Sequence, residues 1–168
     1  MKKIWSIQVQ KDYLKFSAAH FLIFPDGTAE RLHGHNYRVF LEVDTCLDEH
    51  GLVINFQEIK PILRKLVREL NEHLLIPGEH PVLTSEARED GLTEIRYRER
   101  YYLIPTAEII VLPIGNTSVE NLAGWLADTM LQRINEAMPK IEVQRLKIGV
   151  EETVGQQGQV TLFPGEES

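Results

Sequence analysis

Residues 32–37 have the sequence Leu-His-Gly-His-Asn-Tyr, which combines a strand pattern with two potential metal ligands. In an extended strand, side chains two positions apart point to the same face, so His33 and His35 would lie together. A third histidine, His20, ends the segment Phe-Ser-Ala-Ala-His at residues 16–20. Neutral imidazoles are good zinc ligands, and three of them leave a fourth tetrahedral position for water or substrate. Histidines with a purely structural role are the alternative, and the third histidine favours a metal site.

The segments around the histidines alternate apolar and polar residues, as strands do. From about residue 4 to His20 the alternation changes parity near residues 12–13, which indicates a bulge. From His33 to about Leu47 the apolar side chains share the parity of the histidines, which places the histidines at the end of a buried face. Pro-Asp-Gly at residues 25–27 predicts a loop between these two strands.

Two amphipathic helices and a second pair of strands follow. Apolar residues recur at helical spacing over residues 56–70 and about 118–137, and Thr117 opens a capping-box pattern before the second helix. Residues 141–152 and about 159–163 alternate again. We therefore expect an α+β fold, with an antiparallel four-stranded sheet and two helices inserted between the strand pairs.

Residues from about 77 to 113 form an unusually long connection between the helices. A structureless loop of that length would be suspect, so we expect an insertion with a hairpin-like pair of short strands at residues 95–98 and 109–112. The charged residues within it would form either a solvated face or a contact with a substrate phosphate: Arg96, Arg98, Glu99 and Arg100. With this insertion, residues 1–168 fit a single domain, since 43% of them are hydrophobic and can build a core.

Composition excludes several classes of protein. The formal net charge of −7 argues against a general nucleic-acid binder, which would carry a basic face. No apolar stretch approaches the length of a transmembrane helix, so we expect no membrane partner. The single cysteine, Cys46, cannot form an internal disulfide, which suits a cytoplasmic protein.

Glu152 lies at the end of an apolar stripe in the third predicted strand. It shares parity with Leu146, Ile148 and Val150, whereas Glu151 has the opposite parity and is expected in solvent. A carboxylate on a buried face is unfavourable unless something pairs with it. Either a bound ligand or a buried salt bridge would satisfy Glu152.

Several of these motifs resemble the 6-pyruvoyltetrahydropterin synthase and 6-carboxytetrahydropterin synthase family. The resemblance is carried by residues 16–20, residues 32–37 and Val-Glu-Glu-Thr at residues 150–153. Residues 51–56 resemble the family segment before its first helix, although Asn55 stands where the family more often has aspartate. Residues 118–123 resemble the start of its second helix. The resemblance covers nearly the whole chain except about residues 77–113.

The resemblance implies a fold, an assembly and a set of ligands. The fold is the tunnelling fold, in which subunits join their sheets into a barrel, usually as a homotrimer or homohexamer. The implied zinc site consists of His20, His33 and His35, and Glu152 matches the residue that grips the pterin ring through its 2-amino group and ring N–H. The implied substrate is a small-molecule pterin triphosphate, 7,8-dihydroneopterin triphosphate, whose side-chain hydroxyls zinc can polarise.

The sequence departs from the family at the catalytic base. Family members usually carry a cysteine four residues before the first histidine of His-Gly-His, and that position here is Ala29. The adjacent Glu30 begins a Glu-x-Leu-His-Gly-His pattern that resembles one subfamily, in which glutamate replaces the cysteine and the product is 6-hydroxymethyl-7,8-dihydropterin. A solvated loop carboxylate is the alternative for Glu30.

A second departure concerns the Asp-His pair that assists the cysteine in the family. The local sequence here is Leu-Asn-Glu-His-Leu at residues 70–74, so His73 matches the histidine, with Glu72 or Asn71 at the aspartate position. An imidazole beside a carboxylate is a reasonable proton-transfer pair. Glu30, Glu72 and His73 are therefore the candidate catalytic residues.

The leading hypothesis is a zinc-dependent lyase acting on dihydroneopterin triphosphate. Its product would be 6-carboxytetrahydropterin, 6-pyruvoyltetrahydropterin or 6-hydroxymethyl-dihydropterin. Glu30 favours the last of these, and family frequency among short chains favours the first. The alternatives are a catalytically impaired homologue that still binds zinc and pterin, and a protein whose histidines are structural and which binds no pterin.

Overall fold

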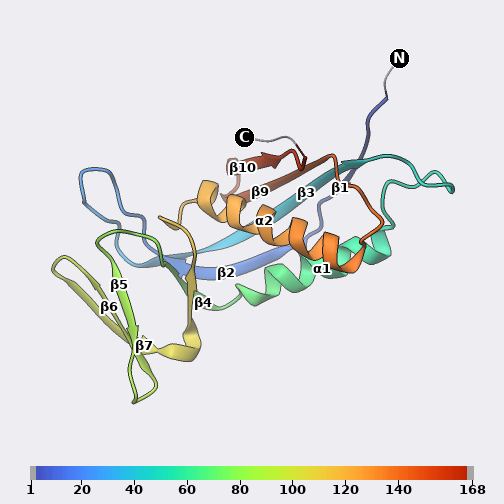
Figure 1. Cartoon of the computed structure of the whole chain (residues 1–168). Helices are drawn as coiled ribbons and strands as arrows, with labels where there is room; N and C mark the ends of the chain where they lie inside the picture. The colour runs from blue at the N-terminus through green and yellow to red at the C-terminus, as the bar shows by residue number, and fades with distance from the viewer. Residues whose placement is uncertain (1–2, 166–168) are drawn as a thin grey trace.

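The computed structural model describes residues 3–165, which form an α+β fold (Figure 1). Along the chain its elements are β1 (Trp5–Val9), β2 (Lys15–His20), β3 (His33–Thr45), α1 (Phe56–Glu69), β4 (His73–Pro77), β5 (Thr84–Ala87), β6 (Leu92–Tyr97), β7 (Arg100–Pro105), a short 3₁₀ turn (Thr106–Glu108), β8 (Ile109–Leu112), α2 (Val119–Ala137), β9 (Arg145–Thr153) and β10 (Gln156–Leu162). Within residues 3–165, neither helix is both long and apolar enough to cross a membrane.

The main sheet has seven strands, so the expectation of a four-stranded sheet is wrong. Its order is β10-β9-β3-β2-β4-β8, and β1 also pairs with β3. The strands from β10 to β2 are antiparallel to their neighbours, whereas β4 and β8 add in parallel at the edge beside β2. These two additional strands come from the segment between the helices, which therefore extends the sheet.

The first predicted strand is divided into β1 and β2, which both pair with β3. Val9 lies opposite Leu41 and Lys15 lies opposite Arg38, so residues 10–14 face residues 39–40. The change of parity in the sequence thus marks a break larger than the expected single bulge. The division keeps the apolar residues of both strands on the face that the helices cover.

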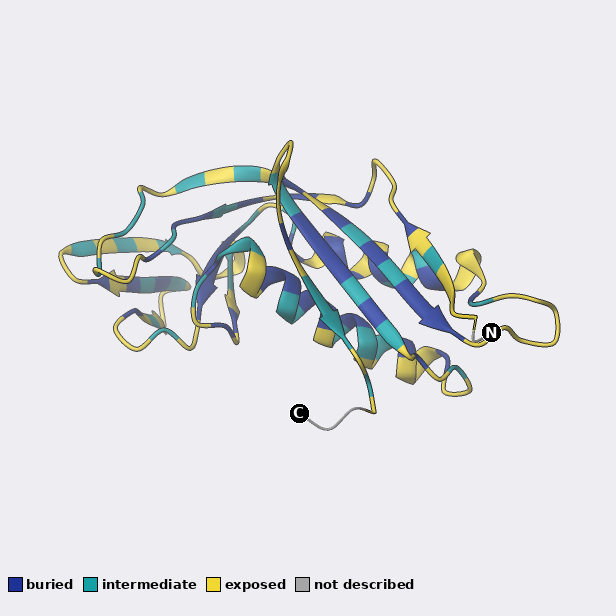
Figure 2. Ribbon diagram, turned by 90° about the horizontal axis from the view of Figure 1, so that it is seen from above, coloured by how far each residue is buried: buried dark blue, intermediate teal, exposed yellow. Residues whose placement is uncertain are grey.

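Both helices cover one face of the main sheet, and the main core lies between the helices and that face (Figure 1). Along the strands of this sheet, buried residues alternate with more exposed ones (Figure 2). Asn55 caps α1 by accepting a hydrogen bond from the N–H of Gln57 at 2.9 Å. The cap of α2 is Ser118, whose hydroxyl accepts from the N–H of Asn121, and not Thr117 as the capping-box pattern indicated.

A second, three-stranded sheet in the order β5-β6-β7 lies beyond the end of the main sheet (Figure 1). The expected hairpin between residues 95–98 and 109–112 is wrong, because β6 pairs with β5 and β7, and β8 pairs with β4. A second cluster of buried residues joins the small sheet to the main one: Phe21, Ile23, Leu74, Ile76, Leu83, Ile95 and Tyr97. Since this cluster includes Phe21 and Ile23, the small sheet packs against the loop that follows β2.

Candidate metal centre

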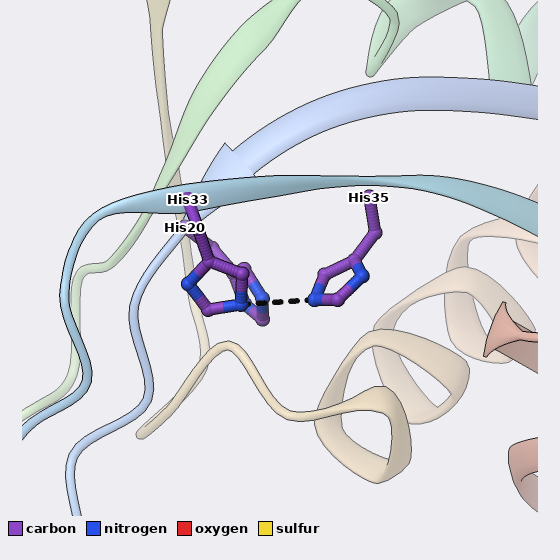
Figure 3. Close-up of side chains that lie close together, drawn as sticks. All are labelled: His20, His33 and His35. Atoms are coloured by element: carbon purple, nitrogen blue, oxygen red, sulfur yellow. Dashed lines mark hydrogen bonds between the residues drawn. The ribbon is translucent and has the colours of Figure 1, made fainter.

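Three histidine side chains meet where β2 ends and β3 begins. His20 is the register partner of His33, and Ala18 is the partner of His35, so the antiparallel pairing places all three rings together. One ring nitrogen from each histidine lies within 4.8 Å of the others. Figure 3 shows the rings pointing from the two strands toward the segment that leads into α2. The structure thus brings together the three histidines that the sequence selected.

His20 has one ring nitrogen engaged and one free. Its side chain is 1% exposed, and its Nδ1 atom lies 3.0 Å from the carbonyl oxygen of Thr117, to which it donates in the neutral ring. Its Nε2 atom is buried and has no hydrogen-bond partner among residues 3–165. Burial lowers the pKa of His20 to about 4, so at neutral pH this nitrogen presents a lone pair.

His33 and His35 complete the set of donors. The Nδ1 atom of His33 lies 2.7 Å from the carbonyl oxygen of Arg31, to which it donates in the neutral ring, with Nε2 then the acceptor nitrogen. That Nε2 atom lies 2.9 Å from the Nε2 atom of His35, so the two rings share either a proton or an ion. A buried, unpartnered nitrogen beside two converging ones is the arrangement expected of a metal site. These three residues can hold a metal ion.

A carboxylate lies beside each of two histidines. Glu30 Oε2 is 3.8 Å from His33 Nε2, and Glu152 Oε2 is 3.9 Å from His35 Nε2. Glu30 reaches this position from the loop between β2 and β3, where its Oε2 atom also accepts a hydrogen bond from the N–H of Leu22. Both carboxylates are partly exposed, so a substrate can reach them.

The two adjacent glutamates at the end of β9 have different partners. Glu152 lies on the face of the histidines, and within residues 3–165 its only ion pair is the one with His35. Glu151 lies opposite Arg38 in the sheet, and its Oε1 atom accepts a hydrogen bond from the N–H of Gly155. No Lys or Arg in the described part of the chain forms a salt bridge with Glu152, which leaves its carboxylate available to a ligand.

Glu72 and His73 lie outside the histidine cluster. His73 begins β4, and Ala18 of β2 stands between it and His35 in the sheet. The Nδ1 atom of His73 is buried without a hydrogen-bond partner in the described residues. Glu72 has a φ of 62°, a left-handed conformation that is uncommon for glutamate. A cavity of about 450 Å³ has His35, Glu72 and His73 in its lining.

The side chain of Asn71 has a structural contact with β2. Its Oδ1 atom accepts a hydrogen bond from the N–H of Ser17 at 2.9 Å, so this side chain ties the end of α1 to β2. Neither Asn71 nor Glu72 bonds to the Nδ1 atom of His73 in the described residues.

A second cavity, of about 670 Å³, joins Glu152 to a group of cations that the sequence patterns did not predict as a site. Ser17 and Asn36 line both cavities, so the two are neighbours. The cations in its lining form no salt bridge within residues 3–165: Lys15, Arg38, Arg64 and Arg68. Glu151 and Glu152 line the same cavity, and the four cations leave it with a local excess of positive charge in a chain whose net charge is −7.

The spacing of Arg64 and Arg68 on one helix face was a signal for half of this group, because residues four apart are neighbours on a helix. Lys15 and Arg38 are register partners between β2 and β3. Their proximity follows from the pairing of the strands, and the distance between them in the sequence gives no sign of it.

A family model and two known proteins to which this chain is similar are all described as tetrahydropterin synthases. A family model described as 6-pyruvoyl tetrahydropterin synthase matches residues 8–160. A Pyrococcus abyssi protein provisionally named 6-carboxy-5,6,7,8-tetrahydropterin synthase is 28% identical over 149 residues, which cover 86% of this chain and 87% of that protein. The crystal structure of 6-pyruvoyl tetrahydropterin synthase from Plasmodium vivax is 26% identical with a TM-score of 0.88, covering 96% of this chain and 99% of that one.

A further structure of the Plasmodium vivax protein is described as a catalytic-residue mutant, in which a glutamate is replaced by alanine. It is 25% identical to this chain with a TM-score of 0.88, and it covers 96% of this chain and 99% of its own.

Proposed function

The chain belongs to the 6-pyruvoyl tetrahydropterin synthase family, and we propose that it is a zinc-dependent lyase that cleaves the side chain of 7,8-dihydroneopterin triphosphate. The proposed product is 6-hydroxymethyl-7,8-dihydropterin. One observation carries this choice: the carboxylate of Glu30 lies 3.8 Å from His33 Nε2. Glu30 directly follows Ala29, the position at which members of the family usually have a catalytic cysteine.

The chemistry of the donor set supports zinc. His20, His33 and His35 would hold the ion through neutral imidazole nitrogens, and three such ligands leave a position for a substrate oxygen. When bound, zinc supplies Lewis acidity that favours loss of a proton from a side-chain hydroxyl. The carbonyl oxygens of Thr117 and Arg31 fix the orientation of His20 and His33 for this task.

Glu152 would bind the pterin ring. An ionised carboxylate can accept two parallel hydrogen bonds, here from the 2-amino group and the neighbouring ring N–H of the pterin. Because Glu152 lies 3.9 Å from His35, a pterin held there would have its side chain close to the histidines and to Glu30. The cavity with Lys15, Arg38, Arg64 and Arg68, which Glu152 also lines, offers positive charge to the triphosphate.

Glu30 would act as the general base of the cleavage. It takes the proton of the hydroxyl on the second side-chain carbon, and that oxygen becomes a carbonyl as the bond between the first and second carbons breaks. The electron pair left on the first carbon is delocalised into the adjacent C=N bond of the ring, and a proton then returns to that carbon. The products are 6-hydroxymethyl-7,8-dihydropterin and glycolaldehyde triphosphate, which together account for all atoms of the substrate. His73, with Glu72 beside it, is a candidate donor of the proton that returns to the first carbon.

The catalytic glutamate in the Plasmodium vivax relative supports a glutamate base here. The name of the Pyrococcus abyssi relative favours a second candidate product, 6-carboxytetrahydropterin. A catalytically impaired homologue is less favoured, because Glu30 supplies the base that the missing cysteine would have supplied. We also propose assembly as a homotrimer or homohexamer, as the resemblance implies.

Product analysis tests the proposal. Zinc-loaded protein is incubated with 7,8-dihydroneopterin triphosphate, and the mixture is separated by chromatography with mass detection. We expect 6-hydroxymethyl-7,8-dihydropterin, and a loss of about 10²–10⁴-fold in turnover for Glu30→Ala with the zinc content unchanged. The matched control is Glu49→Ala, which removes an 87% exposed carboxylate in another turn. Parental turnover in Glu30→Ala would make Glu30 a loop residue only, and the absence of any pterin product from the parent protein would favour the binding-protein alternative.

A further inference from the structure

We infer that the small sheet β5–β7 serves the active site by holding the loop that carries Glu30, with Arg100 as the positioning residue. This inference rests on the proposed role of Glu30 as a base. It adds a function for the insertion, which contributes no residue to the histidine cluster.

Arg100, the first residue of β7, grips two consecutive peptide carbonyls of the loop. Its Nη2 atom donates to the carbonyl oxygen of Ala29, and its Nη1 atom donates to the carbonyl oxygen of Glu30. A guanidinium is a rigid, planar fork, so two such bonds fix the direction of the peptide between them. The Cα atom of Glu30 is thereby fixed at the point from which its side chain extends toward His33.

Tyr97, at the end of β6, holds the same loop at a second place. Its ring is 3% exposed in the second core cluster, and its hydroxyl donates to the carbonyl oxygen of Gly27 at 2.8 Å. Arg98 packs so closely on Gly27 that an added Cβ atom there would lie 1.7 Å from its Nη2 atom. The strands β6 and β7 thus contact the loop over its tip and its return toward β3.

The main body of the protein fixes the start of the loop. Ile23 exchanges hydrogen bonds with the side chain of Asn116, at 3.2 Å from its N–H and 2.9 Å to its carbonyl oxygen. The N–H of Glu30 donates to the carbonyl oxygen of Leu22 at 2.9 Å. These contacts do not reach the carbonyl oxygens of Ala29 and Glu30, which are the two that Arg100 holds.

Holding these carbonyls matters because a general base acts over a narrow range of distance. Loops are more mobile than the strands that they connect, and a misplacement of about 1 Å can lower a rate by about 10²-fold. Among the arginines of the insertion, Arg96 is bonded to Glu94 instead. Arg98 packs on Gly27 at the tip of the loop, so Arg100 is the cation whose removal would free the carbonyl oxygens of Ala29 and Glu30.

The first test measures turnover and zinc content of Arg100→Ala. We expect kcat to fall on the order of 10–100-fold with KM and zinc content nearly unchanged, and guanidinium at millimolar concentration to restore part of the activity. Arg100→Lys keeps the charge without the fork and should be intermediate. The matched control is Arg96→Ala, which removes the same charge from the neighbouring strand and leaves the loop contacts intact, so its kcat should equal that of the parent.

A double variant separates this inference from the proposed function. If Arg100 acts through Glu30, adding Arg100→Ala to Glu30→Ala causes little further loss, because the two changes remove one effect. Parental turnover in Glu30→Ala overturns the assigned base itself. With Glu30→Ala impaired, three results overturn the inference alone: parental kcat in Arg100→Ala, fully additive losses in the double variant, or a rise in KM without a fall in kcat, which would indicate a phosphate contact.

Should Arg100→Ala not fold, as shown by its thermal unfolding curve, Tyr97→Phe serves the same purpose. It removes one hydroxyl and keeps the buried ring, and we expect kcat to fall several-fold at unchanged KM. An unchanged kcat in a folded Tyr97→Phe variant would then count against the small sheet as the support of the loop.

Discussion

His20 Nδ1 lies 3.0 Å from the carbonyl oxygen of Thr117, across 97 residues of sequence. The contact joins the end of β2 to the segment that leads into α2, so the strand and the helix position one imidazole together. Thr117 is fully buried, and its hydroxyl donates to the carbonyl oxygen of Phe21, which ties the same two segments a second time. The hydrogen bond orients the His20 ring, and its Nε2 atom is left without a partner beside His33 and His35.

The first prediction concerns metal content. Purified protein should contain about one zinc per chain, because three imidazoles meet at one point. The double variant His33→Ala/His35→Ala should lose nearly all of it, since a single remaining ligand holds zinc weakly. His50→Ala, which removes a histidine 74% exposed in a turn, is the control and should keep its zinc. Elemental analysis measures the zinc content of each protein. A zinc content in the double variant equal to that of the parent would show that the histidines are structural.

The second prediction concerns Glu152. Glu152→Gln should weaken pterin binding and leave the zinc content unchanged, because an amide loses the charge and one of the two acceptor positions. A hydrogen bond to a charged group contributes about 1.5–3 kcal/mol, which corresponds to about 10–150-fold in Kd. Titration calorimetry with a non-reactive pterin measures it. Glu151→Gln is the adjacent control, and if that variant loses affinity while Glu152→Gln does not, Glu151 is the anchor.

The third prediction concerns the cations near Glu152. Arg68→Ala should raise KM for dihydroneopterin triphosphate about tenfold and weaken its dependence on salt, because one charge facing the phosphates is lost. Binding of dihydroneopterin without phosphates should be unchanged. Arg133→Ala removes a helix arginine that is already paired with Glu69, and KM should stay the same. Equal losses for both pterins in Arg68→Ala would mean that the cavity binds no phosphate.

The alternation of residues in strands predicted that His33 and His35 lie together, for a physical reason. The two-residue period of a strand places the side chains of His33 and His35 on the same face. This can be predicted without knowing the rest of the fold. Glu152 was identified by the same rule. Pairing between distant strands is not encoded in this way, so the register that joins Lys15 to Arg38 stayed hidden.

The insertion was the least predictable part of the chain. The apolar run at residues 109–112 indicates a strand, but it does not state which neighbour it pairs with. The structure places it beside β4 in the main sheet, whereas β6 joins β5 and β7. In the sequence Arg100 is one charge in a cluster, because a contact with backbone carbonyls of another segment leaves no signature in the sequence.

The fourth prediction concerns the ionic contacts that fix β9 against β3. Arg145 on β9 donates to Glu42 and Asp44 on β3, and this register places the far end of β9, with Glu152, beside His35. Burial alone would raise the pKa of Asp44, but hydrogen bonds from Arg145 and Ser6 outweigh it and hold the pKa below its usual value. Hydrogen bonds from Gln8 and Arg145 likewise lower the pKa of Glu42.

Because these pKa values are lower in the folded chain, the unfolded chain binds protons first as pH falls. The stabilisation is therefore complete above about pH 4.5, near the pKa of free carboxyl groups, and it is lost as pH falls further. Arg145→Met should lower the free energy of unfolding by about 1–3 kcal/mol at pH 7, and the difference from the parent should shrink below pH 4. Arg88→Met removes an exposed ion pair with Asp90 and should cost less than about 1 kcal/mol at either pH. Urea unfolding at pH 7 and pH 3.5 measures both variants, and a difference for Arg145→Met that is the same at the two pH values would show that its loss acts through packing alone.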